Sequence, residues 1–326
     1  MKKKAWMAAG IFFGITLLTC LILYISTRMT PQKAWNLIYI PKAKEGTNDF
    51  WTSLISGTRM AADEYGANLQ VMSPEREQDT EQQVEIFREA MELHPDAILI
   101  SPSVSTGNPY LEEARQRGIH IIYVDAVAED PAPELIVSTD NLEVGRRLGE
   151  YTAQQLKPAG RIAIVSQMKN SSTAEEREQG FREGLGELNN NVVEVVYCDS
   201  SFEKATDLTL KLMEKYPDLS LIAGLNEDSS VGAARAVRNR NAEDRIMVVG
   251  VDSSLEAMEL MEQGIFRCIV VQEAFKMGYL GVRETISLLS GKAHGLFVDS
   301  GCELVTKENM FDPRIEKLIF PFKEDS

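Results

Sequence analysis

A repeated alternation of apolar strand patterns and amphipathic helix patterns runs through this chain from Trp35 onwards. The segment 97–101 is apolar on both faces, as a central strand of a parallel sheet requires. Strands that alternate with helices are joined by right-handed crossovers and form a parallel sheet covered by helices on both faces. The first series predicts strands at 36–40, 68–72, 97–101 and 119–124, and helices at 51–65, 80–93 and 111–117.

The same rhythm restarts after Asn141. No segment rich in Pro, Gly or Ser separates the two series, so we expect the chain to cross between two lobes as ordered strands near residue 139. The sequence therefore predicts an α/β fold with two doubly wound parallel-sheet lobes. The second series predicts helices at 142–156, 174–188, 204–216 and 229–239, strands at 161–166, 192–197, 219–224, 246–251 and 268–272, a helix at 274–290 and an extended stretch at 295–304.

The N-terminal segment stands outside this pattern. Three lysines precede the uncharged apolar run 5–25, which as a helix would reach about 32 Å and span a hydrocarbon core. A cleaved signal peptide would have a shorter apolar run and a small-x-small site after it. We therefore expect one uncleaved transmembrane helix at 1–27 and a tether at 28–34, with the N-terminus cytoplasmic and the rest of the chain extracytoplasmic. Leu17-Leu18-Thr19-Cys20 matches a lipoprotein cleavage box weakly, so lipidation at Cys20 stays open.

The charge of the chain argues against nucleic acid as a partner. The formal net charge is −15, and residues 1–34 hold five of the 34 basic residues and none of the 49 acidic ones. The rest of the chain is therefore still more acidic than the net charge states. Such a surface repels nucleic-acid backbones and anionic lipid head groups.

The cysteines form neither a metal site nor a disulfide framework. Outside the expected anchor they are Cys198, Cys268 and Cys302, which are scattered singly without the spacing of metal ligands. Cys268 lies in an apolar strand pattern, so we expect a buried free thiol there. The pairing of the three is otherwise left open.

No catalytic constellation is visible in the sequence. His94, His120 and His294 are widely separated, and none lies in a nucleophile elbow or in metal-ligand spacing. Gly184-x-Gly186 falls inside a helical pattern and does not follow a strand, so it is no dinucleotide fingerprint. We therefore expect a protein that is not an enzyme and that needs no metal or cofactor.

The loop Asn48-Asp49-Phe50-Trp51 lies between the first expected strand and the first expected helix. Open α/β sheets bind ligands beyond the carboxyl ends of their strands. A sugar presents hydroxyls at its edge and C–H groups on its faces, so its site needs planar polar side chains and aromatic rings. One amide and two adjacent rings at this place predict half of a sugar-binding cleft.

Several short groups of residues accompany this loop in a set order and spacing: Asn48-x-Phe50-Trp51 with Gly57 and Ala61-Ala62-Asp63-Glu64-x-Gly66, Asp96-Ala97-Ile98 with Ser101-Pro102, Gly118-Ile119 with Asp125, Thr139-Asp140-Asn141, Arg177-x-x-Gly180-Phe181, Asn226, Gly250-Val251-Asp252 and Gln272. Together they resemble the ribose/galactose-type periplasmic sugar-binding proteins, whose fold is shared with the ligand domains of lactose-repressor-type proteins. The resemblance covers roughly residues 35–321.

The resemblance implies a two-lobed clamp without a catalyst. The chain would cross three times between an N-terminal lobe (35–138 plus 273–298) and a C-terminal lobe (139–271 plus 299–326). These crossings would form a hinge whose closure traps a monosaccharide of the pentose or hexose class. Such proteins are the substrate-binding components of sugar ABC transporters.

The resemblance also implies the residues of the site. Phe50 and Trp51 would stack on one sugar face and Phe202 on the other, while Asp125 and Asp252 accept hydroxyl protons. The full set comprises Asn48, Phe50, Trp51, Ser101 and Asp125 from the first lobe, Arg177, Phe202, Asn226 and Asp252 from the second, and Gln272 at a crossing.

Each residue taken alone has a structural alternative. Asp125 and Asp252 could each cap a following helix, Phe202 could belong to the core, and Arg177 could pair with an adjacent glutamate on the surface. Two positions also depart from the resemblance: where ribose binders have Asn this chain has Ser101, and where they have Arg directly after the strand-end Asp it has Ala126. The prediction of a sugar ligand is unaffected by these departures, but they leave no basis for naming ribose as the sugar.

Two partners remain open for a membrane-anchored sugar binder. It could deliver its ligand to an ABC permease, or it could dock on a membrane histidine kinase or chemoreceptor and report lobe closure. A transporter needs only a tether, so a permanent span modestly favours sensing.

Overall fold

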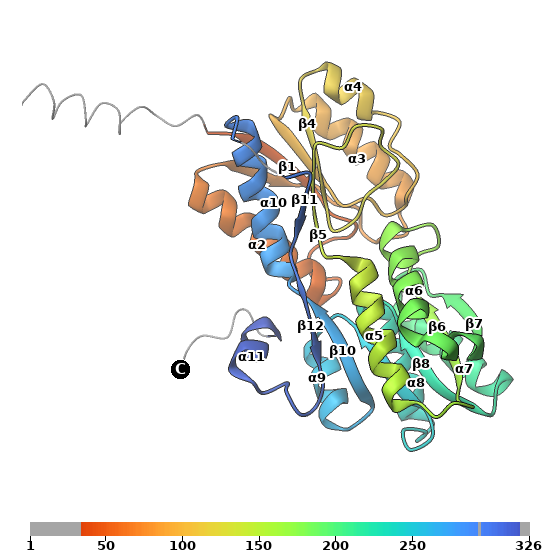
Figure 1. The fold of residues 1–326 in the computed structure, drawn as a ribbon. Coiled ribbons are helices and arrows are strands. Elements are labelled where there is room, and N and C mark those ends of the chain that lie inside the picture. The colour runs from red at the N-terminus through yellow and green to blue at the C-terminus, as the bar shows by residue number, and fades with distance from the viewer. Residues whose placement is uncertain (1–33, 293–294, 320–326) are drawn as a thin grey trace, which may run out of the picture. The chain divides into compact units, whose positions relative to one another are not determined.

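In the computed structural model, which describes residues 34–292 and 295–319, strands and helices alternate as the sequence predicts (Figure 1). The expected anchor at 1–27 and nearly all of the tether at 28–34 lie outside these residues. Within the described ranges, no helix combines the length and the apolar character that a membrane crossing needs.

The first sheet has six parallel strands in the order β11-β5-β4-β3-β1-β2. Successive residues of β1 alternate between two cores, with Leu37 and Tyr39 facing helices α2 and α10 and Ile38 and Ile40 facing α3 and α4. We call this sheet and its four helices the first lobe. Its elements are β1 Asn36–Ile40, α2 Asp49–Tyr65, β2 Asn68–Val71, α3 Thr80–Glu92, β3 Ala97–Ile100, α4 Leu111–Gln116, β4 His120–Val124, β5 Leu135–Ser138, α10 Ala274–Leu289 and β11 Phe297–Asp299.

The second sheet has the order β12-β10-β9-β8-β6-β7, and only its edge strand β12 runs antiparallel to its neighbour. Helices α5 and α6 cover one face, and α7, α8, α9 and α11 cover the other. We call this sheet with its helices the second lobe. Its elements are α5 Asn141–Gln155, β6 Arg161–Ser166, α6 Ser172–Leu185, β7 Val192–Tyr197, α7 Phe202–Lys215, β8 Leu219–Gly224, α8 Glu227–Asn239, β9 Met247–Val251, α9 Leu255–Glu262, β10 Phe266–Gln272, β12 Cys302–Val305 and α11 Pro313–Ile319.

Several short elements differ from the sequence prediction, which also gave no separate strand for β5. The extended stretch 295–304 is two short strands, β11 and β12, that join different sheets. Helices α9 and α11 were not predicted. Both span fewer than ten residues, and so short an apolar pattern does not by itself distinguish helix from strand or loop.

The chain passes between the two sheets after β5, after β10 and after β11. These passages lie beside the predicted lobe boundaries at 138/139, at 272 and at 298/299. They place the carboxyl ends of β4, β9 and β10 near the junction of the two lobes. Whether the three segments bend as a hinge stays a prediction.

Each lobe contains a pair of helices on one face of its sheet that cross at glycines. A Cβ on Gly57 of α2 would lie 2.0 Å from the Phe275 carbonyl oxygen of α10, and one on Gly180 of α6 would lie 2.0 Å from the Leu142 carbonyl oxygen of α5. Only glycine permits so close a backbone approach. These crossings hold each helix pair rigidly beside its sheet.

Candidate functional site

A buried polar cavity lies where strand ends of the two lobes meet. Its free volume is about 20 Å³, which is room for about one water molecule. The small volume follows from direct contacts between the side chains of the two lobes. Its lining comprises Lys42, Asn48, Phe50, Trp51, Glu77 and Asp125 from the first lobe and Gln167, Thr173, Arg177, Asn226, Glu227, Asp252 and Gln272 from the second.

The loop before α2 supplies an amide and two rings to this cavity. Asn48 has an extended backbone and caps α2, with its side-chain oxygen accepting from the Trp51 backbone N–H at 3.0 Å. The rings of Phe50 and Trp51 lie 5.0 Å apart at 86°. Because they are perpendicular, only one of them can lie parallel to the face of a flat ligand ring. Trp51 donates its indole N–H to Glu77 Oε1 at 2.7 Å, which fixes the orientation of the indole.

Asp125 follows β4 in the left-handed backbone region, at φ 68°. Asp is among the few non-glycine residues that tolerate this conformation. Its carboxylate lies 2.8 Å from the ammonium of Lys42, and both side chains are almost fully buried. Asp125 therefore caps no helix. Lys42 Nζ also lies 5.8 Å from the centre of the Trp51 ring.

Asp252 follows β9 in the same left-handed conformation, at φ 69°. It accepts from Gln272 Nε2 at 2.7 Å and from the Glu227 backbone N–H at 3.2 Å, and it lies 3.8 Å from the guanidinium of Arg177. The helix that follows is capped by Ser254 instead. Burial raises the pKa of Asp252, and the Arg177 charge works against this rise.

Arg177 is buried and is not a surface ion-pair partner. It donates to Asn141 Oδ1 at 2.8 Å and to the Leu225 carbonyl at 2.9 Å. These two bonds fix the planar guanidinium beside Asp252. An arginine held in this way presents its remaining donors in a defined direction.

The amino ends of α2 and α8 face each other across the lobe junction. Glu227, the first residue of α8, accepts from the backbone N–H groups of Asp49 and Phe50 at 3.3 and 3.1 Å. A carboxylate is favoured there because unpaired N–H groups and the helix dipole make a helix amino end positive. Asp228 Oδ2 accepts from both capping amides, Asn48 at 3.3 Å and Asn226 at 3.1 Å.

Two carboxyl groups at this junction have perturbed titration. Burial and then the neighbouring Asp228 raise the pKa of Glu227 well above its ordinary value. Burial and then the charge of Glu77 raise the pKa of Asp228 well above its ordinary value. Both groups are therefore easier to protonate here than in an unfolded chain.

The structure brings eight of the ten sequence-predicted residues to the cavity, the exceptions being Ser101 and Phe202. Ser101 is buried outside the lining, with its hydroxyl 3.0 Å from that of Tyr39. Phe202 begins α7 and packs at the edge of the second-lobe core, with the Arg235 guanidinium 5.1 Å from its ring centre. The expected aromatic face from the second lobe is thus not found at the cavity, and the core alternative describes Phe202 better.

Five lining residues were missed in the sequence: Lys42, Glu77, Gln167, Thr173 and Glu227. Four of them follow a strand within a few residues: Lys42 follows β1, Glu77 follows β2, Gln167 follows β6 and Glu227 follows β8. The rule that open α/β sheets bind ligands at strand carboxyl ends would have found these four. Thr173 instead lies in the first turn of α6 and carried no such signal.

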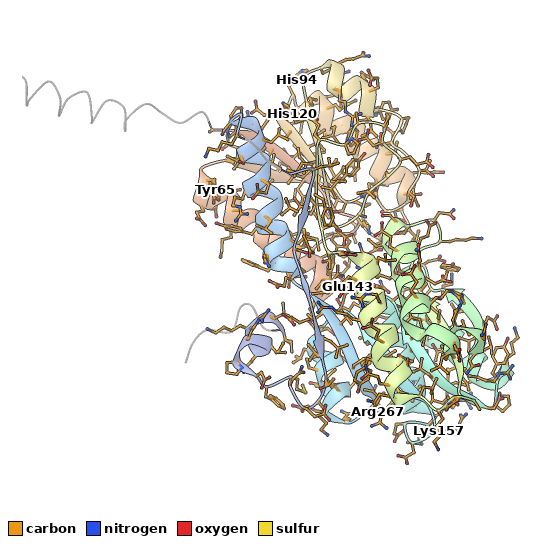
Figure 2. All side chains as sticks on the ribbon, viewed as in Figure 1. Tyr65, His94, His120, Glu143, Lys157 and Arg267 are labelled. Atoms are coloured by element: carbon orange, nitrogen blue, oxygen red, sulfur yellow. The ribbon has the colours of Figure 1, made fainter. Side chains whose placement is uncertain are left out.

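The histidines and cysteines described by the structure do not join the cavity. His94 follows α3 and His120 begins β4, at the edge of the sheet opposite the carboxyl ends (Figure 2). Cys268 is buried with a free thiol, as predicted, and Cys198 and Cys302 are also free. His294 lies outside the described residues.

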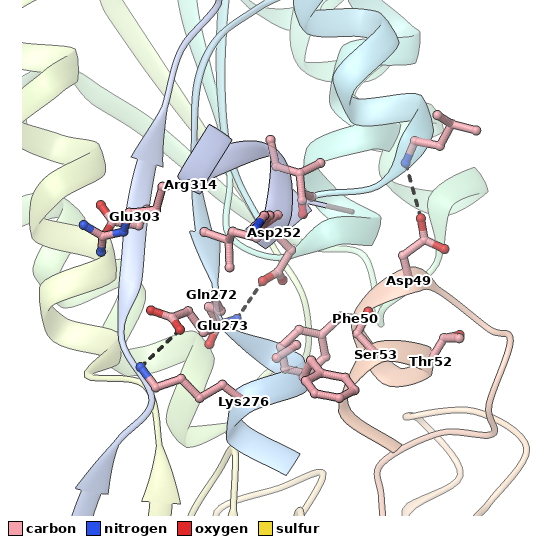
Figure 3. A pocket seen from close by; sticks show the side chains of 17 residues that line it. Asp49, Phe50, Thr52, Ser53, Asp252, Gln272, Glu273, Lys276, Glu303 and Arg314 are labelled. Carbon is pink, nitrogen blue, oxygen red and sulfur yellow. Dashed lines mark hydrogen bonds and ion pairs between the residues drawn. The ribbon is translucent and has the colours of Figure 1, made fainter. Parts of the chain in front are cut away.

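A larger hollow of about 660 Å³ shares Phe50, Asp252 and Gln272 with the small cavity (Figure 3). Its other walls come from the starts of α2 and α10, from Ser253, Leu255 and Glu303, and from α11, and the Lys276–Glu273 ion pair lies on it. The convergent buried polar groups line the smaller cavity. That cavity is therefore the candidate ligand site.

Comparison with known proteins gives a family for most of the chain. Residues 40–293 match the family described as periplasmic binding protein domain. Among curated proteins, the D-ribose/D-allose-binding protein of Pseudomonas aeruginosa is 23% identical over 258 residues, covering 76% of this chain and 81% of that protein. The ribose import binding protein of Bacillus subtilis is 24% identical over 262 residues, covering 80% of this chain and 84% of that protein.

Two solved structures are similar over nearly their whole length. A protein from Clostridium phytofermentans described as a sugar transporter is 39% identical, with a TM-score of 0.79, covering 84% of this chain and 99% of that one. A carbohydrate transporter solute-binding protein from Agrobacterium radiobacter, in complex with D-arabinose, is 26% identical with a TM-score of 0.82, covering 88% and 99%.

Proposed function

The chain belongs to the periplasmic binding protein family, and from this premise we propose that it binds a monosaccharide of the pentose or hexose class between its two lobes. One observation carries the proposal. Buried donors and acceptors from both lobes converge on a single cavity beside Phe50 and Trp51. Planar polar side chains next to an aromatic ring match the edge and face of a sugar. The relatives named above are described as sugar-binding or sugar-transport proteins.

Binding proceeds by closure of the two lobes. The cavity of about 20 Å³ is far below the roughly 300–1,000 Å³ of ordinary ligand sites. The bonds from Asp49 and Phe50 to Glu227 and from Asn48 to Asp228 join the lobes directly. A sugar therefore reaches the site only when the lobes part. The predicted hinge of three crossings, between lobes 35–138 plus 273–298 and 139–271 plus 299–326, gives that motion.

The ligand is handed to an ABC permease from the extracytoplasmic side of the membrane. The uncharged run 5–25 holds the protein at the membrane, and the lobes follow a tether at 28–34. The names of the relatives, which include an import binding protein and a transporter solute-binding protein, support the transport role.

Sensing is the second candidate function, and the anchor expected from the uncharged apolar run 5–25 favours it. The tether 28–34, about seven residues, separates the expected helix 1–27 from the first lobe, so the lobes would stay within roughly 25 Å of the bilayer. A membrane histidine kinase or chemoreceptor could read lobe closure at that distance.

Calorimetry on the full-length chain tests the binding proposal. D-Ribose, D-allose and D-arabinose are the first probes, because one relative is named for the first two and another was solved in complex with the third. We expect one of them to bind with 1:1 stoichiometry and to raise the melting temperature by mass action. Absence of binding across pentoses, hexoses and related polyols would contradict the proposal.

Deleting the gene in its host separates the two roles. Loss of radiolabelled sugar uptake supports transport. Preserved uptake with loss of the transcriptional response to the sugar supports sensing.

A further inference from the structure

Lys42 is the one lysine that lines the buried cavity among the residues the structure describes. It follows β1, and its side chain is about 5% exposed. A lysine is almost never buried to this extent unless it is paired. Its partner is Asp125, at 2.8 Å.

This pair lies where the sequence departs from ribose binders. Ala126 follows Asp125, so the first lobe has no arginine at that place. The Ser101 hydroxyl is hydrogen-bonded to the Tyr39 hydroxyl at 3.0 Å, and serine has no amide to offer to the cavity. The ammonium of Lys42, which follows β1, instead contacts the carboxylate of Asp125, which follows β4. An ammonium has three N–H donors, and the pair with Asp125 leaves at least one of them for a ligand.

The opposite wall offers an acceptor without a donor. Gln272 directs its amide nitrogen to Asp252 at 2.7 Å, so its carbonyl oxygen points elsewhere. This oxygen is buried and has no hydrogen-bond partner, and the same holds for Oε1 of Gln167. Buried polar atoms are nearly always satisfied, so both oxygens call for donors from a bound molecule.

Each of the two cations in the lining faces a carboxylate, while the other two acidic side chains of the lining, Glu77 and Glu227, accept from N–H and O–H donors. Lys42 faces Asp125, and Arg177 faces Asp252 at 3.8 Å. An anionic ligand group that drew Lys42 away would leave Asp125 buried and unpaired, which is strongly unfavourable. A cationic group that drew Asp125 away would do the same to Lys42.

We propose that Lys42, held by Asp125, is the specificity-determining donor of the first lobe, and that it selects uncharged polyhydroxyl ligands over sugar acids and amino sugars. One ligand oxygen accepts from Lys42, and ligand hydroxyls donate to Asp125 and to the Gln272 carbonyl. This inference rests on the proposed sugar-binding function and names the ligand class of the same site.

Calorimetry on the full-length chain with D-ribose, D-allose, D-arabinose, D-glucuronate, D-ribose 5-phosphate and D-glucosamine tests it. We expect a neutral sugar to bind and the charged probes to bind at least about tenfold more weakly. Lys42→Met should weaken the neutral sugar by roughly 10- to 100-fold, because a hydrogen bond from a charged donor is lost. The matched control is Lys44→Met, since Lys44 is exposed and pairs only with Glu75 at the surface.

Deoxy analogues of the bound sugar separate a donor from a structural role. One analogue should bind the wild type about tenfold more weakly than the parent sugar, and Lys42→Met should bind both equally. Lys42→Met/Asp125→Asn removes the pair together, and it serves as the test if Lys42→Met alone does not fold.

Three outcomes overturn the inference. If a neutral sugar binds Lys42→Met as tightly as the wild type, the role of Lys42 is overturned but the proposed sugar-binding function stands. Tighter binding of a charged probe than of every neutral sugar also overturns it. Failure of all neutral sugars to bind overturns the proposed function as well.

Discussion

The two lobes present the same local geometry to the cleft but fill it with different chemistry. Asn48 and Asn226 cap helices with nearly identical backbone angles, and Asp125 and Asp252 both end a strand at a φ near 69°. The first lobe then offers one ammonium and two rings. The second offers a fixed guanidinium and several carboxyl groups. Repeated backbone geometry therefore sets where polar groups lie, and the side chains around it set what each half recognises.

Replacing each strand-end carboxylate by an amide tests this difference, and we expect these substitutions to have the largest effect. Asp252→Asn should weaken sugar binding by about 100-fold or more, because Asp252 orders Arg177, Gln272 and the amino end of α8 together. Asp125→Asn should cost about tenfold, since it has only Lys42 as a charged partner. Calorimetry measures both. Equal losses would show that the two halves are energetically equivalent.

Alanine substitutions at the two glycine crossings compare how tightly the helices pack in each lobe. Gly57→Ala and Gly180→Ala each force a methyl group to within 2.0 Å of a backbone oxygen, so the helices must separate. We expect each to lower the free energy of unfolding by about 1–3 kcal/mol in urea. The control is Gly295→Ala, whose Cβ would meet only an ordinary contact at 3.5 Å. Unchanged stability in either variant would refute close packing in that lobe.

The carboxyl groups of the second lobe should give the protein a pH dependence. A carboxyl whose pKa is raised on folding holds more protons folded than unfolded, so its contribution to stability falls as pH rises above about 4.3, the ordinary value for Glu. We expect the melting temperature to fall between pH 5 and pH 8. Glu227→Gln keeps an acceptor for the α2 amides and should reduce this fall in melting temperature by a few degrees. The conversion is about 2–4 °C per kcal/mol of unfolding free energy. An identical slope in both proteins would argue against Glu227 as the source.

The smallest effect is expected at Phe202. Its ring packs beside Arg235 and not in the cavity, so Phe202→Leu should leave sugar affinity within about twofold. Phe50→Leu is the matched change at a ring that does line the cavity, and it should weaken binding by roughly tenfold. A large loss in Phe202→Leu would place a second aromatic face at the sugar after all.

The periodicity of the chain was sufficient to predict two doubly wound sheets, because strands buried on both faces and helices buried on one leave a local signature. It did not resolve α9, α11 or the division of 295–304 between two sheets. Those elements are short, and their place is decided by neighbours that are distant in the chain.

The site shows the same division. Residue type and place after a strand pointed to the Asn48 loop, whereas Asp125, Asn226 and Asp252 were predicted only through the resemblance to a family. The partners were decided only by tertiary structure. Lys42 meets Asp125 across 83 positions of the chain, and Phe202 lies outside the cavity, because contacts between side chains distant in the sequence depend on how strands and helices pack within each lobe, and no local pattern encodes them.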